Sequence, residues 1–206
     1  MALIHRATIQ PTKLELLADW LTDRPWYQGA GEPTRIAGYR FDDPAGAVGI
    51  ETILLRAGDG PVHQVPLTYR ESPLAGAESV LIGTMEHSVL GTRWVYDGCA
   101  DPVYAAALAT AILTGAGQVA EFVDVDGRLE PRELSMAIHA TGAGRPPVVE
   151  GIDAVTDADL TVITTSGLEL TVVRRLDGEP GLTGATLSGT WAGQATPVVL
   201  AGASAH

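Results

Sequence analysis

The chain has 206 residues, of which 46% are hydrophobic and 18% are charged, and its formal net charge is −12. This hydrophobic fraction excludes intrinsic disorder as the default state and is sufficient for a buried core. The excess of acidic residues argues against nucleic acids and anionic membrane surfaces as partners, because both attract basic protein surfaces.

The N-terminal segment predicts a strand followed by a helix. Residues 2–10 alternate between apolar and polar side chains, which is typical of a strand. Thr12 and Glu15 then have the spacing of a capping box, in which each side chain accepts a hydrogen bond from the backbone N–H of the other. Leucines at helical spacing follow, so we expect a short amphipathic helix that Pro25 ends.

Five further strands are predicted in the first half of the chain. Three of them end at turns, namely residues 35–41, 48–56 and 62–70, and residues 80–86 and 92–97 are two further candidates. The Gly-Asp-Gly turn at 58–60 predicts an antiparallel hairpin.

A second helix is predicted after these strands. Asp101 and Pro102 suit its N-cap and first helical position, and Gly115 suits its end. Replacing Asp101 by alanine is expected to cost about 1 kcal/mol of stability, as the loss of an N-cap does. The helix is rich in alanine, which favours close packing against a sheet.

The second half of the chain is predicted to be mostly antiparallel β-structure. Its candidate strands are residues 134–140, 160–165, 168–172, 185–191 and 196–200, with a surface loop at 142–147. Nine of the eleven aromatic residues lie in the first half, so we expect that half to be better able to fold alone. We expect an α+β fold with one domain at residues 1–116 and a β-rich C-terminal lobe at residues 117–206.

No sequence motif for catalysis, metal binding or cofactor binding stands out. The chain has no Gly-x-Ser-x-Gly, His-Glu-x-x-His or Walker A motif, and Lys13 is its only lysine. Its single cysteine, Cys99, excludes an internal disulfide and a cysteine-rich zinc site. Asp124 and Asp126 have the spacing of part of a calcium loop, but Phe122 would occupy the first ligand position. We expect no catalytic, cofactor-binding or metal-binding residues.

Two aromatic clusters are the candidates for binding a ligand or a partner. Their residues are Trp26, Tyr27, Arg93, Trp94, Tyr96 and Asp97. An exposed aromatic face beside carboxylates could hold a sugar by stacking and hydrogen bonding. The alternative is that the aromatic residues anchor the core of a small α+β domain.

The same clusters carry a resemblance to a known family. Arg-Pro-Trp-Tyr at 24–27 and the string Trp-Val-Tyr-Asp-Gly-Cys-Ala-Asp-Pro within 89–104 resemble the N-terminal cap domain of actinobacterial maltokinases. Segments 65–69 and 81–83 add to a similarity that covers about residues 1–115 and extends to short stand-alone actinobacterial proteins. The resemblance implies a cystatin-like fold, in which a curved antiparallel sheet carries two helices.

What the resemblance implies for activity is limited. The full kinases transfer phosphate from ATP to maltose and feed α-glucan synthesis, but their catalytic residues lie in a large C-terminal lobe whose pattern this sequence lacks. Gly29 and Ala30 stand where the kinase cap has a Gly-Lys pair.

Three functions therefore remain as hypotheses. The first is a non-catalytic, cap-like accessory or partner-binding protein linked to α-glucan or trehalose metabolism. The second is a binder of an α-glucan or maltose-like sugar, or a weak glycan-acting enzyme using Glu86, Asp97 and Asp101 as its carboxylates. The third is a structural homo-oligomer formed through strand edges.

The predicted location is the cytoplasm. The longest apolar run, residues 103–113, is eleven residues long, whereas a membrane-spanning helix needs about 20. The N-terminus lacks the continuous apolar segment of a signal peptide.

Overall fold

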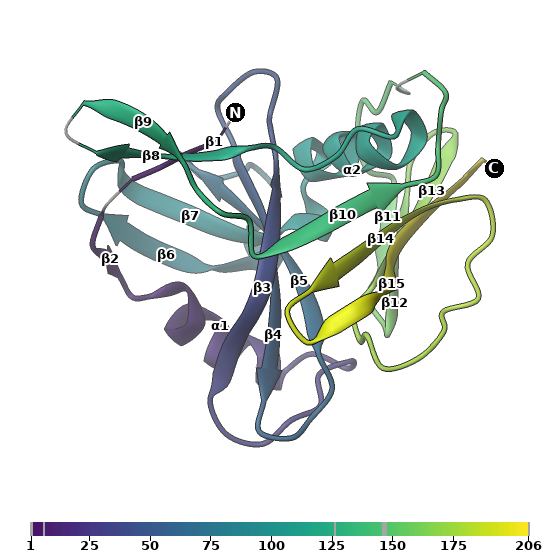
Figure 1. The fold of residues 1–206 in the computed structure, drawn as a ribbon, viewed down its shortest axis with the longest axis horizontal. Helices are drawn as coiled ribbons and strands as arrows, with labels where there is room; N and C mark the ends of the chain where they lie inside the picture. Colours follow the sequence, from purple (N-terminus) through teal and green to yellow (C-terminus); the bar gives the residue numbers. More distant parts are fainter. Residues whose placement is uncertain (1, 6, 126, 146–147, 206) are drawn as a thin grey trace.

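The structure is a computed structural model that describes residues 2–5, 7–125, 127–145 and 148–205 (Figure 1). These residues form two six-stranded sheets, a three-stranded sheet and two α-helices. The predicted α+β class with mostly antiparallel strands is therefore confirmed. Neither helix of the described chain has the length and apolar character that a membrane span requires.

The first sheet is antiparallel and curled, with the strand order β2-β6-β7-β5-β4-β3 (Figure 1). Its strands are β2 (Ile9–Gln10), β3 (Pro33–Phe41), β4 (Gly49–Ala57), β5 (His63–Arg70), β6 (Leu81–His87) and β7 (Gly91–Asp97). The five strands predicted between residues 35 and 97 are confirmed. The hairpin between β4 and β5 is also confirmed, and Gly58 adopts the positive φ of 55° that its turn requires.

The single strand predicted over residues 2–10 is wrong. The segment contains two strands, β1 (Ala2–Ile4) and β2, which belong to different sheets. β1 pairs in parallel with β8 (Glu121–Val125), whereas β2 pairs with β6 of the curled sheet. One continuous strand could not pair with both β8 and β6. The alternating pattern of residues 2–10 does not indicate which strands pair with them.

Helix α1 (Lys13–Thr22) covers one face of the curled sheet. Its capping box is confirmed: the Glu15 N–H donates to Thr12 Oγ1 at 3.3 Å, and the Thr12 N–H donates to Glu15 Oε2 at 2.7 Å. Leu17 and Leu21 are fully buried and pack against strands β4, β5 and β7. The opposite side of the helix carries polar residues, so the predicted amphipathic pattern positions the helix.

Helix α2 (Pro102–Thr114) begins and ends as predicted. The Val103 N–H donates to Asp101 Oδ1 at 2.9 Å, and Gly115 caps the C-terminus with a left-handed φ of 74°.

Replacing Asp101 should cost more than the loss of a cap. Its fully buried carboxylate also accepts two hydrogen bonds from the Arg70 guanidinium, both at 2.7 Å, and one from Thr68 Oγ1 at 2.8 Å. We therefore expect Asp101→Ala to lower the free energy of unfolding by about 2–3 kcal/mol, which urea denaturation would measure. Asp101→Asn keeps a capping oxygen and should cost less. Equal losses in the two variants would contradict a contribution from the cap, and an Asp101→Asn variant as stable as wild type would contradict a contribution from the ion pair.

The second sheet is antiparallel and has the order β10-β14-β15-β13-β12-β11. Its strands are β10 (Met136–Ala140), β11 (Ala154–Thr156), β12 (Leu160–Thr164), β13 (Leu168–Val173), β14 (Ala185–Trp191) and β15 (Gln194–Ala205). The β-rich character predicted for the second half is confirmed. Of the predicted loop at 142–147, residues 142–145 have no helix or strand, and residues 146–147 lie outside the described part.

The third sheet has the order β1-β8-β9, with β9 at Arg128–Pro131. A turn with an Asp124–Gly127 hydrogen bond joins β8 to β9, which agrees with a turn in place of a calcium loop; Asp126 itself lies outside the described residues. Two 3₁₀ helices complete the fold, η1 (Glu78–Val80) and η2 (Gly98–Ala100).

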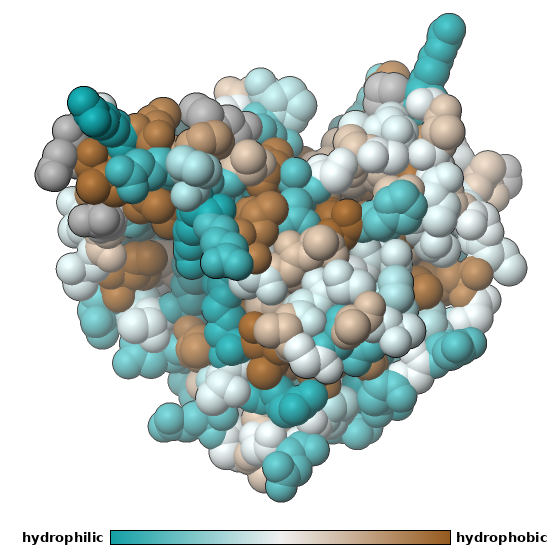
Figure 2. All heavy atoms as spheres, viewed as in Figure 1, coloured by the Kyte–Doolittle hydropathy of each residue, from teal (hydrophilic) through white to brown (hydrophobic). Residues whose placement is uncertain are grey.

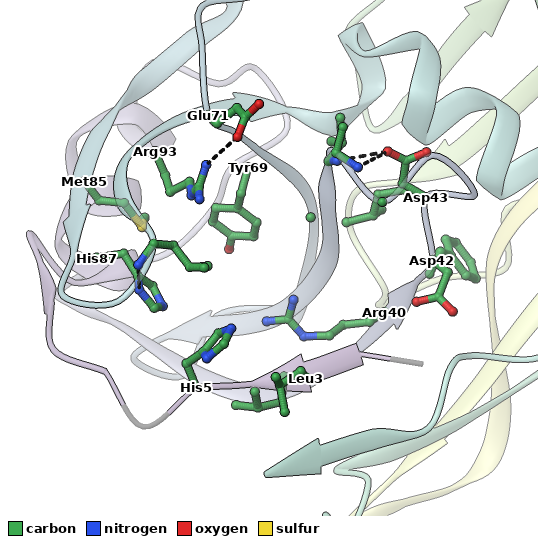
Figure 3. A pocket seen from close by; sticks show the side chains of 18 of the residues that line it. Leu3, His5, Arg40, Asp42, Asp43, Tyr69, Glu71, Met85, His87 and Arg93 are labelled. Carbon is green, nitrogen blue, oxygen red and sulfur yellow. Dashed lines mark hydrogen bonds and ion pairs between the residues drawn. The ribbon is translucent and has the colours of Figure 1, made fainter. Parts of the chain in front are cut away.

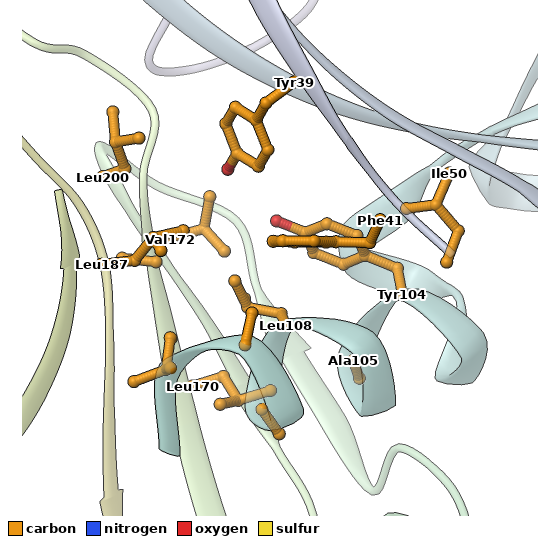
Figure 4. Packing of buried hydrophobic residues seen from close by; sticks show 14 of the residues in the cluster. Tyr39, Phe41, Ile50, Tyr104, Ala105, Leu108, Leu170, Val172, Leu187 and Leu200 are labelled. Atoms are coloured by element: carbon orange, nitrogen blue, oxygen red, sulfur yellow. The ribbon is translucent and has the colours of Figure 1, made fainter. Parts of the chain in front are cut away.

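The larger core lies between the two six-stranded sheets and surrounds α2 (Figure 4). It combines side chains of β3 and β4, of α2 and of the second sheet: Tyr39, Phe41, Ile50, Tyr104, Leu108, Leu170, Val172, Leu187 and Leu200. Strand β4 is therefore buried on both faces, with α1 on one side and this core on the other. Residues from both sides of position 116 share this core, and the predicted division into domains at 116 stays a prediction.

Candidate functional site

The six predicted binding residues do not share one environment. Trp26, Tyr96 and Asp97 are buried, while Tyr27, Arg93 and Trp94 are partly exposed. Tyr96 also accepts a hydrogen bond from the Leu74 N–H at 2.9 Å. A ligand at the surface could therefore reach only the remaining three residues.

Trp26 and Asp97 belong to a buried polar cluster around Arg174. The Arg174 side chain is 0% exposed, and its Nη2 lies 2.6 Å from Asp97 Oδ2. Its guanidinium carbon lies 4.8 Å from the Trp26 ring centroid, and Trp26 Nε1 donates to Asp157 Oδ1 at 2.8 Å. This cluster joins strand β7 and the loop after α1 to the second sheet. Sequence reasoning missed it, because nothing near Arg174 marks it as a partner of Asp97.

The three carboxylates considered for glycan chemistry also have separate structural partners. Asp97 pairs with Arg174, and Asp101 pairs with Arg70. Glu86 is exposed and accepts a hydrogen bond from Thr92 Oγ1 at 2.7 Å. None of the three lines the cavity described next.

A cavity of about 420 Å³ opens at the side of the curled sheet that carries β1 and β2 (Figure 3). Its polar lining includes the cations Lys13, Arg40 and Arg93, the imidazoles of His5 and His87, and the Tyr69 ring. Apolar side chains such as Leu3, Met85 and Leu90 complete the wall. The lining comes from α1, from each of the strands β1 to β7, and from the turns beside them, and of the six predicted residues only Arg93 contributes to it.

The fold brings His5 and His87 together, although they are far apart in the sequence. Ile9 of β2 pairs with His87 of β6, and the two imidazole centroids are 5.8 Å apart in an edge-on arrangement. The sequence offered no signal for this contact, because the pairing of β2 with β6 was not predicted.

A buried carboxylate, Glu51, lies behind the wall of this cavity and contacts the lining residues Lys13, Arg40 and Tyr69. Three cations surround it: Lys13 Nζ at 2.5 Å, Arg40 Nη2 at 2.8 Å and Arg35 Nη1 at 2.9 Å. The Tyr69 hydroxyl also donates to Glu51 Oε2 at 2.9 Å. Glu51 points to the α1 side of the sheet, as Ile53 and Leu55 do, because side chains alternate along β4.

These contacts shift the pKa values of the cluster. Burial alone would raise the pKa of Glu51, but Lys13, Arg40 and Arg35 together hold it well below its usual range. Burial and then the Glu51 carboxylate raise the pKa of Tyr69 well above its usual value, so its hydroxyl stays protonated. Burial lowers the pKa of Lys13, although Glu51 opposes that shift.

His87 presents an N–H group in its neutral form. Its Nδ1 accepts hydrogen bonds from the backbone N–H groups of Val89 at 3.2 Å and Leu90 at 3.1 Å. The ring proton of neutral His87 is therefore on Nε2. Burial, followed by the nearby His5 and Arg93, lowers the pKa of His87 and favours this neutral form.

The described residues contain no group of three or more His, Cys, Asp or Glu side chains that could hold a metal ion. One end of the cavity offers hydrogen-bond donors and positive charge.

Residues 20–101 match the family model for the maltokinase N-terminal cap domain. The matched segment begins near the end of α1, includes β3 to β7 and ends at the N-cap of α2, so it contains five of the six strands of the curled sheet. The match confirms the resemblance to maltokinase caps for this part of the chain. A comparison with curated proteins gave no match.

Proposed function

We propose that this protein is a non-catalytic, cap-like accessory protein that binds an enzyme of α-glucan or trehalose metabolism. The observation that carries the proposal is the match of residues 20–101 to a maltokinase cap, which is a domain that forms part of a larger enzyme. We link the partner to glucan or trehalose metabolism because the matched family is named after maltokinases.

The surface that we propose for the partner is an apolar end made of Leu3, Val89, Leu90 and Leu129. Val89 is 56% exposed and Leu129 is 48% exposed, and the other two leucines exceed one third exposure. Leu3 and Leu90 line the mouth of the cavity, and Leu129 lies on β9, two strands from β1. Figure 2 shows hydrophobic residues gathered over the end of the molecule where β1, β8 and β9 lie. Clustered exposed apolar residues are typical of protein interaction sites.

Strand β9 adds a second feature to the same end. It is one of the two edge strands of its sheet among the described strands, and all four of its residues are exposed. An exposed edge can pair with a strand of another chain, and the exposed Leu129 side chain on β9 would add apolar contact.

The test is affinity capture followed by direct binding. The tagged full chain is used to capture partners from a lysate of the source cells, and the captured enzyme is then purified and titrated with three forms of the protein. We expect wild type and Val155→Asp to bind alike, and the double variant Val89→Asp/Leu129→Glu to bind about tenfold more weakly or worse. Val155 is a matched control because it is an exposed apolar residue on β11, which belongs to the second six-stranded sheet.

Two results would contradict the proposal. One is a set of captured proteins that contains no enzyme of α-glucan or trehalose metabolism. The other is equal affinity of the double variant and wild type. Light scattering of the purified chain separates partner binding from self-association, which is the homo-oligomer hypothesis.

A sugar ligand is the second candidate function. The cavity favours it, since polar groups and an aromatic ring line a space of about 420 Å³, within the range of small-molecule sites. Maltose is therefore included among the probes of the cavity below.

A further inference from the structure

The cluster around Glu51 contains more positive than negative charge. Lys13, Arg35 and Arg40 share this one carboxylate as their close partner. A second carboxylate, Glu121, lies 3.8 Å from Arg40 but is also 3.4 Å from Arg132. Two of the cations, Lys13 and Arg40, line the cavity, so part of the excess positive charge faces that space.

Arg93 adds a further cation from strand β7. Its side chain is only 16% exposed, and its ion pair with Glu71 is long, at 4.0 Å. The Glu71 side chain is 76% exposed, so this pair is weak and screened by water. A guanidinium that is largely removed from water and weakly paired favours an anion beside it.

The neighbouring groups on this side of the cavity complete a set of donors. Figure 3 shows Arg93, His87, His5 and Arg40 pointing toward the same space. The Nε2–H of neutral His87 can donate a hydrogen bond, since Nδ1 is occupied by the backbone of the β6–β7 turn.

Of the acidic lining residues, the exposed Glu71 lies beside Arg93, whereas Asp42 and Asp43 lie at the other end of the cavity (Figure 3). Both carboxylate oxygens of Asp43 accept backbone hydrogen bonds within the β3–β4 turn, from Ala45, Ala47 and Val48, each at 2.9 Å. Positive charge is therefore concentrated where Arg93, Lys13 and Arg40 meet.

We propose that this end of the cavity binds an oxyanion, either the phosphate or the carboxylate group of a small ligand. Arg93 contributes the weakly paired guanidinium, Lys13 and Arg40 contribute the excess charge of the Glu51 cluster, and His87 contributes an N–H donor. A volume of about 420 Å³ leaves room for the remainder of a small ligand beyond the anionic group. The inference goes beyond the proposed partner binding and does not depend on it.

Calorimetric titration of the full chain tests the site with four probes: inorganic phosphate, glucose 1-phosphate, succinate and maltose. We expect at least one anionic probe to bind and maltose to give no measurable binding at the same concentrations. Binding of the phosphates but not of succinate would assign a phosphate ligand, and the reverse would assign a carboxylate. Binding that weakens as sodium chloride is added is also expected.

Arg93→Gln is the decisive variant. It removes the cation from a weak ion pair, so it should leave the thermal midpoint nearly unchanged while weakening binding by about tenfold or more. Arg56→Gln is the matched control, since Arg56 is an exposed arginine on β4 outside the cavity, and it should change binding by less than about twofold. Arg93→Lys keeps the charge and should retain more binding than Arg93→Gln.

Three results would overturn the proposal. They are the absence of binding by every anionic probe at millimolar concentration, maltose binding without anion binding, and equal affinities of wild type and Arg93→Gln. Each leaves the partner proposal intact, because partner binding is measured with variants at the apolar end.

Discussion

Replacing Arg174 with methionine should lower the free energy of unfolding by about 3–5 kcal/mol. The guanidinium is fully buried, with Asp97 at 2.6 Å, Thr161 Oγ1 at 2.8 Å and Asp157 at 3.8 Å. Removing it would leave Asp97 buried without a cation, which costs more than the pair itself contributes. The contact between the guanidinium and the Trp26 ring would be lost as well.

The neighbouring Arg175 provides the control for this prediction. Its side chain pairs with Asp159 and Asp177, both about half exposed, so Arg175→Met should cost less than about 1 kcal/mol. Guanidinium chloride denaturation of wild type and both variants measures the difference. For a chain of this size, each kcal/mol corresponds to about 2–4 °C in the thermal midpoint. Similar midpoints for the two variants would show that the Arg174 cluster does not hold the two halves together.

Replacing Glu51 with glutamine should lower the free energy of unfolding by about 3–4 kcal/mol at neutral pH. The substitution leaves Lys13, Arg35 and Arg40 close together without the carboxylate that they share. The three cations are partly exposed and can turn toward water, which keeps the loss near the lower end of the range for broken buried pairs. Urea denaturation of wild type and Glu51→Gln at neutral pH measures this loss in the free energy of unfolding.

The Glu51 variant should also respond differently to acid. The folded-state pKa of Glu51 is well below its ordinary value of 4.5, because the effect of the three cations exceeds that of burial. A carboxyl group of this kind contributes stability that is complete above its unfolded pKa and is lost as the pH falls through its folded pKa. The difference in stability between wild type and Glu51→Gln should therefore shrink as the pH falls below about 4.5.

A matched variant separates this effect from general acid sensitivity. Glu86 is an exposed carboxylate on the same sheet, and Glu86→Gln should follow the wild-type pH dependence closely. A stability difference between Glu51→Gln and wild type that stays constant down to about pH 3 would contradict the lowered pKa.

The parts of the fold that the sequence predicted are those set by local chemistry. The capping box of Thr12 and Glu15 and the Asp101-Pro102 start of α2 each act within one helical turn, so spacing alone identifies them. The strands of the curled sheet were likewise predictable from their apolar pattern and their turns.

The parts that the sequence did not predict depend on contacts between distant segments. Residues 2–10 divide between two sheets because β1 and β2 have different partners, and strand pattern does not reveal partners. Arg174 and Glu51 are charged residues that a sequence reading places at the surface, yet both are buried among charges from other elements. The cavity arises from such contacts, which is why Arg93 was its only predicted member.

The two proposed sites lie at the same end of the molecule. Leu3 and Leu90 belong both to the apolar end and to the cavity wall, so a docked partner would lie beside the mouth of the proposed oxyanion site. Partner binding and ligand binding can therefore influence each other through shared residues, and each remains measurable alone with its own variants.

The central claim is that the apolar end is the partner-binding surface. Hydrogen exchange measured on the complex with the captured enzyme is its most direct test. We predict slower amide exchange in β1, in the turn around Val89 and in β9, with unchanged exchange in β11 of the other sheet. Protection confined to β11 or elsewhere on the second sheet, with unchanged exchange at the apolar end, would contradict it.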